Sequence, residues 1–194
     1  MTNFDFNDAE TKRNFDVIPD GTIATVRMAV RPGSVGEDGW LRRSKDGKSE
    51  ALDCEFTVLG GPSARRKFWS LLITAGTTPG HAEAAKISAG KLRAILESAR
   101  GIKPDDTSDA AKQARRIGSY GELNGLIFIA RIGVEPPQNG YEAKNRLDRA
   151  ITPDEKAWHP VTQEPAPAGA SAPTTSAKPA STPAKIERPA WAKE

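Results

Sequence analysis

The sequence has very few of the cysteine and histidine residues that form disulfides and bind metal ions. Its single cysteine, Cys54, excludes an internal disulfide and a zinc ribbon, and neither histidine has a cysteine or carboxylate at metal-ligand spacing. No run approaches the roughly 20 apolar residues that span a bilayer. The N-terminus is acidic and lacks an apolar centre, so we expect no signal peptide and a location in the cytoplasm.

Recognised catalytic motifs are also lacking. The segment "GGPSARRK" at residues 60–67 has two glycines and a basic end, but not the spacing of a phosphate loop. The paired carboxylates Asp105 and Asp106 are better explained as part of a helix cap, and no nucleophile motif occurs. We therefore expect a binding protein that needs no cofactor, while an enzyme with dispersed catalytic residues stays an open alternative.

The net charge is small, because 28 Lys and Arg residues stand against 25 Asp and Glu residues, giving +3. Affinity for a polyanion would have to come from clustered cations.

The composition also divides the chain into three parts. We predict an arm at residues 1–13, a folded domain at 14–158 and a tail at 159–194 rich in Pro, Ala, Ser and Thr. Such a tail buries too little apolar surface to offset the entropy of ordering it, which predicts disorder.

Alternation of apolar and polar residues predicts the strands. In "GTIATVRMAVR" (residues 21–31), Ala24, Val26, Met28 and Val30 share one face. Asp46-Gly47 predicts a hairpin between residues 40–45 and 48–56. The segment 54–58 joins 66–73 through Gly60-Gly61-Pro62, and residues 126–135 and 141–151 supply the last two strands.

Between these strands the apolar period lengthens to three or four residues. It predicts a helix from Pro79 to about Arg100, with Thr78 as N-cap and Gly101 closing it, and a shorter helix capped by Ser108. This order favours a mainly β, α+β fold: an OB-like five-stranded barrel with a helical insertion between strands three and four. An ordinary α+β sheet with helices on one face is the alternative.

Cations and tryptophans gather around the predicted strands. Arg65, Arg66 and Lys67 directly precede Phe68 and Trp69, and other cations flank the Asp46-Gly47 turn. Cations that track phosphates, with aromatic rings that stack on bases, are what single-stranded nucleic acids require. The alternatives are a solvated turn for the cations and a core position for either tryptophan. The candidate contacts are Arg27, Arg31, Trp40, Arg42, Arg43, Lys45, Lys48, Arg65, Arg66, Lys67 and Trp69.

Several ordered blocks carry a resemblance, among them "FDVIPDGTIATVRMAV", "LDCEFTVLGGPSARRKFWSLL" and "GYEAKNRLDRAI". Over about residues 4–158 the chain resembles a family of small phage and prophage proteins that accompany replication or recombination genes. The resemblance implies binding of single-stranded DNA and a bacterial host cell as the location. It makes Lys144 and Arg146 candidate phosphate contacts, and we interpret Asn145 as structural.

The leading hypothesis is a non-enzymatic single-stranded-DNA-binding protein of phage origin, and a homo-oligomer is compatible with it. The tail ends in "IERPAWAKE", so Pro189 and Trp191 are candidates for recruiting a replication or recombination protein, although the acidic run typical of bacterial single-strand binding proteins is missing. The alternatives are an adaptor that docks on an acidic partner through its basic hairpin, and an accessory enzyme that modifies DNA.

Overall fold

The computed structural model describes residues 16–138 and 140–163. The predicted arm and the candidate partner-binding residues Pro189 and Trp191 lie outside the described residues, as does the tail from residue 164 onward. The predictions for those segments therefore stay predictions.

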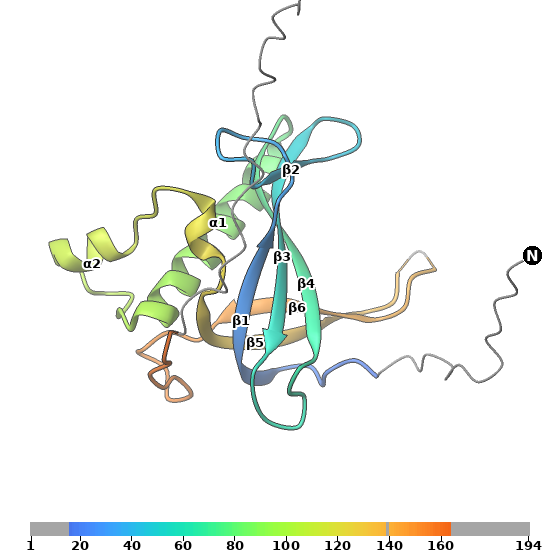
Figure 1. Ribbon diagram of the computed structural model, residues 1–194. Coiled ribbons are helices and arrows are strands. Elements are labelled where there is room, and N and C mark those ends of the chain that lie inside the picture. The colour runs from blue at the N-terminus through green and yellow to red at the C-terminus, as the bar shows by residue number, and fades with distance from the viewer. Residues whose placement is uncertain (1–15, 139, 164–194) are drawn as a thin grey trace, which may run out of the picture.

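The fold is a mainly β, α+β structure built on a six-stranded antiparallel sheet (Figure 1). The strand order is β2-β3-β1-β5-β6, and β4 pairs with the other edge of β3. The sheet is not closed, because β4 and β6 share no backbone ladder. The strands are β1 (Thr22–Arg31), β2 (Leu41–Arg43), β3 (Ser49–Val58), β4 (Lys67–Gly76), β5 (Ile127–Glu135) and β6 (Lys144–Ala150).

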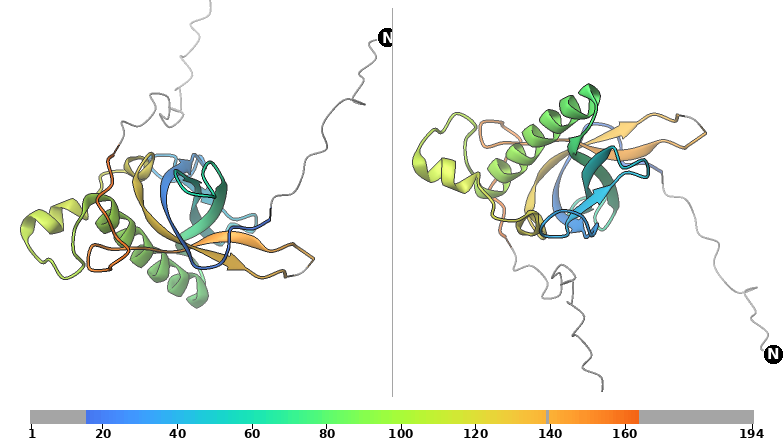
Figure 2. Two further views of the ribbon diagram at one scale, coloured as in Figure 1. Left: turned by 90° about the horizontal axis from the view of Figure 1, so that it is seen from below. Right: turned by 90° about the horizontal axis from the view of Figure 1, so that it is seen from above.

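The helices follow β4 and begin at the residues that the sequence predicts. Helix α1 (Pro79–Arg100) is capped by the Thr78 side chain and ends at Gly101, whose φ of 67° is left-handed. Helix α2 (Asp109–Ala114) is capped by Ser108. A short 3-10 helix, η1 (Tyr120–Leu123), was not predicted. Helix α1 packs against β4, β5 and β6 and runs along one side of the sheet (Figure 2).

The core lies under the inner face of the sheet. Val26, Met28 and Val30 of β1 are buried there, which confirms the face predicted from their alternation. The Phe56 ring stacks on Phe68 with centroids 5.1 Å apart and meets Phe128 edge-on at 6.0 Å. Cys54 is buried, and burial raises the pKa of its thiol to about 12.

The five-stranded barrel expected from the sequence is only partly matched. The short β2 adds a sixth strand, so the helical insertion follows the fourth strand in chain order. Strands β4 and β6 nevertheless lie side by side. At this seam the backbone N–H of Leu147 donates to the Ser70 hydroxyl at 2.9 Å, and the Lys91 ammonium donates to the Leu147 carbonyl at 3.0 Å. Side chains therefore satisfy both backbone groups of Leu147.

Two amide side chains hold the ends of the described chain. Asn145 accepts from the Ile18 N–H at 2.7 Å and donates to the Ile18 carbonyl at 2.8 Å. Gln163 makes the same paired contact with Ile127, accepting at 2.9 Å and donating at 2.7 Å. Asn145 thus has the structural contact that its sequence interpretation requires.

Candidate nucleic-acid interface

The strand register builds a charged outer face from β1, β3 and β4. Arg31 of β1 lies opposite Asp53 of β3, and Glu55 of β3 lies opposite Trp69 of β4. Because side chains alternate along each strand, these residues point away from the core that their neighbours fill. Residues distant in sequence therefore meet on one surface.

Glu55 is the centre of this surface. Its carboxylate accepts hydrogen bonds from Lys67 at 2.6 Å, from Arg31 at 2.9 Å and from the Trp69 indole Nε1 at 3.1 Å. Partial burial opposes ionisation, but these three donors outweigh it and lower the pKa of Glu55. The carboxylate consequently stays charged and holds the two cations and the indole in fixed positions.

Trp69 is fixed by hydrogen bonding but remains exposed to solvent. The residue is 46% exposed, and the guanidinium carbon of Arg31 lies 5.5 Å from the centroid of its ring. This distance is within the range of a cation–π interaction. An aromatic ring fixed at its edge and open to solvent is suited to stack on a flat ligand, because little side-chain entropy remains to be lost.

A groove of about 480 Å³ borders Trp69 along the seam between β4 and β6. Five cations and two carboxylates line it, so its charge is positive. Leu71, which is 57% exposed, adds an apolar patch. The charged lining residues are Arg31, Arg42, Lys91, Lys144, Arg146, Asp53 and Glu135.

The structure brings some of the sequence-predicted residues together. The groove contains Arg31, Arg42, Trp69, Lys144 and Arg146. Arg42 pairs with Asp53 at 3.3 Å, and Lys144 pairs with Glu135 at 3.3 Å. The cations of both pairs are exposed, but the side chain of Asp53 is only 17% exposed and that of Glu135 is 38% exposed. Exposed pairs contribute little to stability, about 0–1 kcal/mol, so a phosphate replaces Glu135 at a smaller cost than Asp53.

Lys67 and Arg27 extend the same face without lining the groove. Lys67 joins it through Glu55. Arg27 lies on β1 between Thr57 of β3 and Ile127 of β5 in the strand register, and it is half-buried.

The OB-like barrel expected from the sequence would place the cations of the Asp46-Gly47 hairpin and those of the Arg65–Arg66 turn at one groove, but only Arg42 of the hairpin lines the groove, and Arg65 and Arg66 do not. The hairpin turn precedes β3 and the Arg65–Arg66 turn follows it (Figure 1). A strand of 10 residues separates them by about 30 Å. The turn itself is tightly built: Arg65 has a left-handed φ of 67°, and the Arg66 guanidinium donates to the Asp16 carbonyl.

The hairpin is also largely neutralised by its own acids. Arg43 pairs with Glu50 at 2.8 Å, and Lys48 lies 4.0 Å from Asp46. Lys45 is exposed on the turn and does not line the groove. The hairpin is therefore a weaker candidate for an acidic partner than its composition indicates.

Trp40 is buried in the core and is therefore not a candidate for stacking on a base. It is 4% exposed and belongs to the hydrophobic core. Its indole lies against Gly121 of η1 so closely that a side chain at Gly121 would meet the ring at 2.8 Å. The sequence left open whether Trp40 or Trp69 belongs to the core. The packing of η1 against the Trp40 indole shows that Trp40 does.

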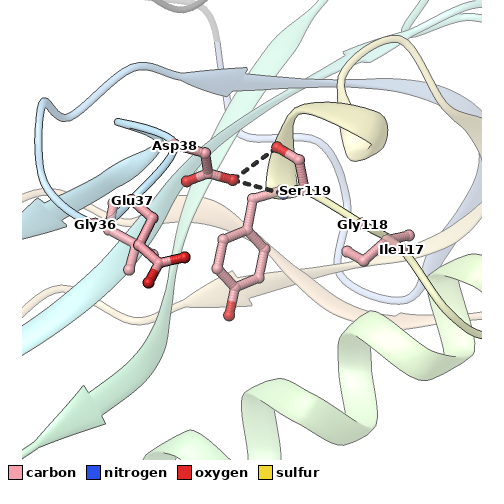
Figure 3. A pocket seen from close by; sticks show the side chains of 8 residues that line it. Gly36, Glu37, Asp38, Ile117, Gly118 and Ser119 are labelled. Carbon is pink, nitrogen blue, oxygen red and sulfur yellow. Dashed lines mark hydrogen bonds between the residues drawn. The ribbon is translucent and has the colours of Figure 1, made fainter.

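A second hollow, of about 410 Å³, lies between the loop after β1 and η1 (Figure 3). Asp38 bridges its two walls, accepting from the Ser119 hydroxyl at 2.6 Å and from the Tyr120 N–H at 3.1 Å. The Ser119 hydrogen bond is the main cause that lowers the pKa of Asp38. Glu37 is the other charged residue in this lining, so the hollow offers no cation for a phosphate.

Sequence reasoning missed one residue of the groove, Lys91, and one exposed aromatic residue outside the groove lining, Tyr141. Tyr141 lies at the tip of the β5–β6 hairpin and is 77% exposed, and its position directly after a turn was the signal for it. Lys91 lies on α1 among buried positions, three residues after Ser88 and four before Ile95. A lysine on the buried side of a helix must either be paired or emerge at a surface, and here it emerges in the groove.

The described residues thus form a mainly β, α+β protein with a basic groove beside an exposed tryptophan. Within residues 16–138 and 140–163, no group of His, Cys, Asp and Glu side chains is arranged to hold a metal ion. No helix in the same ranges has the length and apolarity to cross a membrane. Comparison with models of known protein families finds none that matches the chain, and comparison with curated protein sequences finds no significant match.

Proposed function

We propose that this is a non-enzymatic single-stranded-DNA-binding protein of phage origin that acts in DNA replication or recombination. The observation that carries the proposal is Trp69: an indole 46% exposed, held by Glu55 and Arg31, at the border of a groove lined by five cations. Exposed aromatic rings beside a cationic groove are the features by which proteins bind single strands with little sequence preference.

The energies favour such a ligand. Stacking of one base on an aromatic ring contributes about 1–3 kcal/mol and tolerates every base. A phosphate contact at Arg31 competes with the Glu55 carboxylate, whose side chain is only 17% exposed. Release of counterions from the strand adds a further favourable contribution that depends on salt.

The topology supports an OB-like barrel that is partly open. The five long strands have the order β4-β3-β1-β5-β6, with α1 following β4 and with β4 and β6 adjacent at the seam. In an OB-fold the ligand lies across the middle strands and between two loops. We assign β2 to an insertion in the first of these loops, and the β5–β6 hairpin that carries Tyr141 to the second.

A single strand fits this surface better than a duplex. Stacking on Trp69 needs a base whose face is free, and bases in a duplex are already stacked on their neighbours. The proposal therefore includes a preference for single-stranded DNA over duplex DNA of equal length.

Fluorescence anisotropy with the full-length protein tests this proposal. Labelled oligo-dT should bind more tightly than a duplex of the same length, and Trp69→Ala should weaken oligo-dT binding while Trp69→Phe restores most of it. Lys103→Ala combined with Lys156→Ala is the matched control, because both lysines are exposed and neither lines the groove. Failure of the wild-type protein to bind either DNA would sink the proposal and favour the adaptor hypothesis.

A further inference from the structure

Lys91 lies where helix α1 meets the seam of the sheet. It is half-buried, and its ammonium donates one hydrogen bond, to the Leu147 carbonyl at 3.0 Å. A lysine ammonium has three donors. The remaining donors of Lys91 are left for a ligand, because Lys91 lines the groove.

Arg146 of β6 lies near Lys91 on the same groove. The other three cations of the lining already have carboxylate partners: Arg31 pairs with Glu55, Arg42 with Asp53 and Lys144 with Glu135. Neither Lys91 nor Arg146 forms an ion pair with any carboxylate in the described chain. Among the described residues, the two are thus the cations of the groove that form no ion pair.

The electrostatics of Lys91 agree with this geometry. Burial, and next the positive charge of Arg146, lower its pKa, while Asp148 on β6 acts in the opposite direction. The other charged groups on the groove are Arg31 of β1, Arg42 of β2, Asp53 of β3, Glu135 of β5 and Lys144 of β6. Two like charges held close together in a partly desolvated site attract an anion.

We propose that Lys91 and Arg146 form a phosphate-binding position at the seam, which holds a backbone phosphate of the strand whose base stacks on Trp69. This inference rests on the proposed function and assigns a part of that site that lies on the helix instead of the sheet. A phosphate fits the pair because it offers several strong acceptor oxygens to the free donors of both side chains.

Phosphate binding at Lys91 and Arg146 should make the affinity for DNA depend on pH. A bound phosphate favours the charged ammonium, so the pKa of Lys91 is higher in the complex than in the free protein. Binding therefore takes up a proton when the pH exceeds the lowered pKa of free Lys91, and affinity falls as pH rises through that value. An arginine at this position keeps its charge and removes the dependence.

The experiment measures oligo-dT affinity of the full-length protein by anisotropy, from about pH 7 to 10 and over a range of salt. Lys91→Gln should weaken binding about tenfold or more and flatten the salt slope by about 0.7. Lys91→Arg should keep the affinity and lose the fall at high pH. Arg146→Ala, an exposed substitution with little risk to folding, should weaken binding in the same way.

The outcomes separate the two proposals. If the wild-type protein binds oligo-dT but Lys91→Gln and Arg146→Ala leave both affinity and salt slope unchanged, the phosphate position is wrong and the proposed function stands. If the wild-type protein does not bind, the proposed function fails, and titration with inorganic pyrophosphate by calorimetry tests the anion position alone. Pyrophosphate binding equal in wild type and Lys91→Gln would overturn it.

Discussion

The carboxylate of Glu55 on β3 accepts a hydrogen bond from the indole Nε1 of Trp69 on β4 at 3.1 Å. The same carboxylate engages Arg31 and Lys67, so one acid both orients the stacking ring and occupies the cations beside it. An incoming phosphate must compete with Glu55 for these cations. The acid therefore improves the geometry of the site while reducing its affinity for polyanions.

Glu55→Gln separates these two effects. The amide oxygen still accepts from Trp69, while the negative charge is lost, so oligo-dT affinity should rise severalfold and its salt dependence should steepen. Anisotropy titrations at several salt concentrations measure both. Glu83→Gln, an exposed change on α1, removes the same charge away from the groove and should have little effect. Weaker binding by Glu55→Gln would mean that orientation of the ring outweighs charge.

Trp69→Ala and Trp40→Ala should have opposite consequences. Losing the exposed Trp69 should reduce oligo-dT affinity by about 5- to 150-fold, the equivalent of about 1–3 kcal/mol, with little change in the free energy of unfolding. Losing the buried Trp40 should destabilise the fold by about 3–5 kcal/mol. Chemical denaturation together with anisotropy measures both. A large stability loss for Trp69→Ala would remove it from the interface.

The two groups of cations can be ranked by salt dependence. Lys144→Ala with Arg146→Ala should flatten the slope of log K against log salt by about 0.7 for each phosphate that the protein no longer neutralises. Arg65→Ala with Arg66→Ala, at the far end of β3, should flatten it less. An equal or larger change for the Arg65 and Arg66 pair would show that the bound strand extends along all of β3.

Asp38→Asn should change stability at neutral pH but not in strong acid. The folded-state pKa of Asp38 lies below its unfolded value, because Ser119 and Tyr120 donate to the carboxylate. The resulting stability is present above the unfolded pKa and is lost as pH falls through the folded one. The difference in unfolding free energy between wild type and Asp38→Asn should therefore shrink as the pH falls below the unfolded-state value of about 3.9. A difference independent of pH would contradict this assignment.

Removing residues 164–194 tests the prediction that Pro189 and Trp191 recruit a replication or recombination protein. Truncation after Gln163 preserves the Gln163–Ile127 contacts, so folding should not be affected. DNA affinity should stay nearly intact, while capture of a replication or recombination protein by the full-length chain should be lost. If truncation weakens oligo-dT binding severalfold, lysines of the tail belong to the DNA site, and the hypothesis that the tail recruits a protein fails.

Local sequence patterns were sufficient for the long strands and for helices α1 and α2, but not for η1. Alternation in β1 assigned Val26 and Met28 to the core, and Thr78 and Gly101 marked the ends of α1, because these features depend on neighbours in the chain. The long-range pairings were not accessible in this way. Nothing local indicates that Glu55 faces Trp69, or that a lysine of α1 reaches the Leu147 carbonyl.

The error about the basic surface has the same origin. Composition identified clustered cations but could not distinguish those neutralised by nearby acids, such as Arg43 with Glu50, from Arg146. The predicted strands already placed the hairpin and the Arg65–Arg66 turn at opposite ends of residues 48–58, and this separation was not weighed against the clustering of cations. Trp40 was ambiguous because its burial depends on η1, a segment distant in sequence.

The seam between β4 and β6 also bears on solubility. Each strand turns its unpaired edge toward the other, so neither presents a long free edge to a second chain, the usual route to aggregation of β-proteins. In the described chain, the protein hydrogen bonds at this seam are those made by the two backbone groups of Leu147. Each contributes only about 1 kcal/mol net. Amide protons along these two edges should therefore exchange with solvent well before those of β1 and β3, and the sheet should open there first.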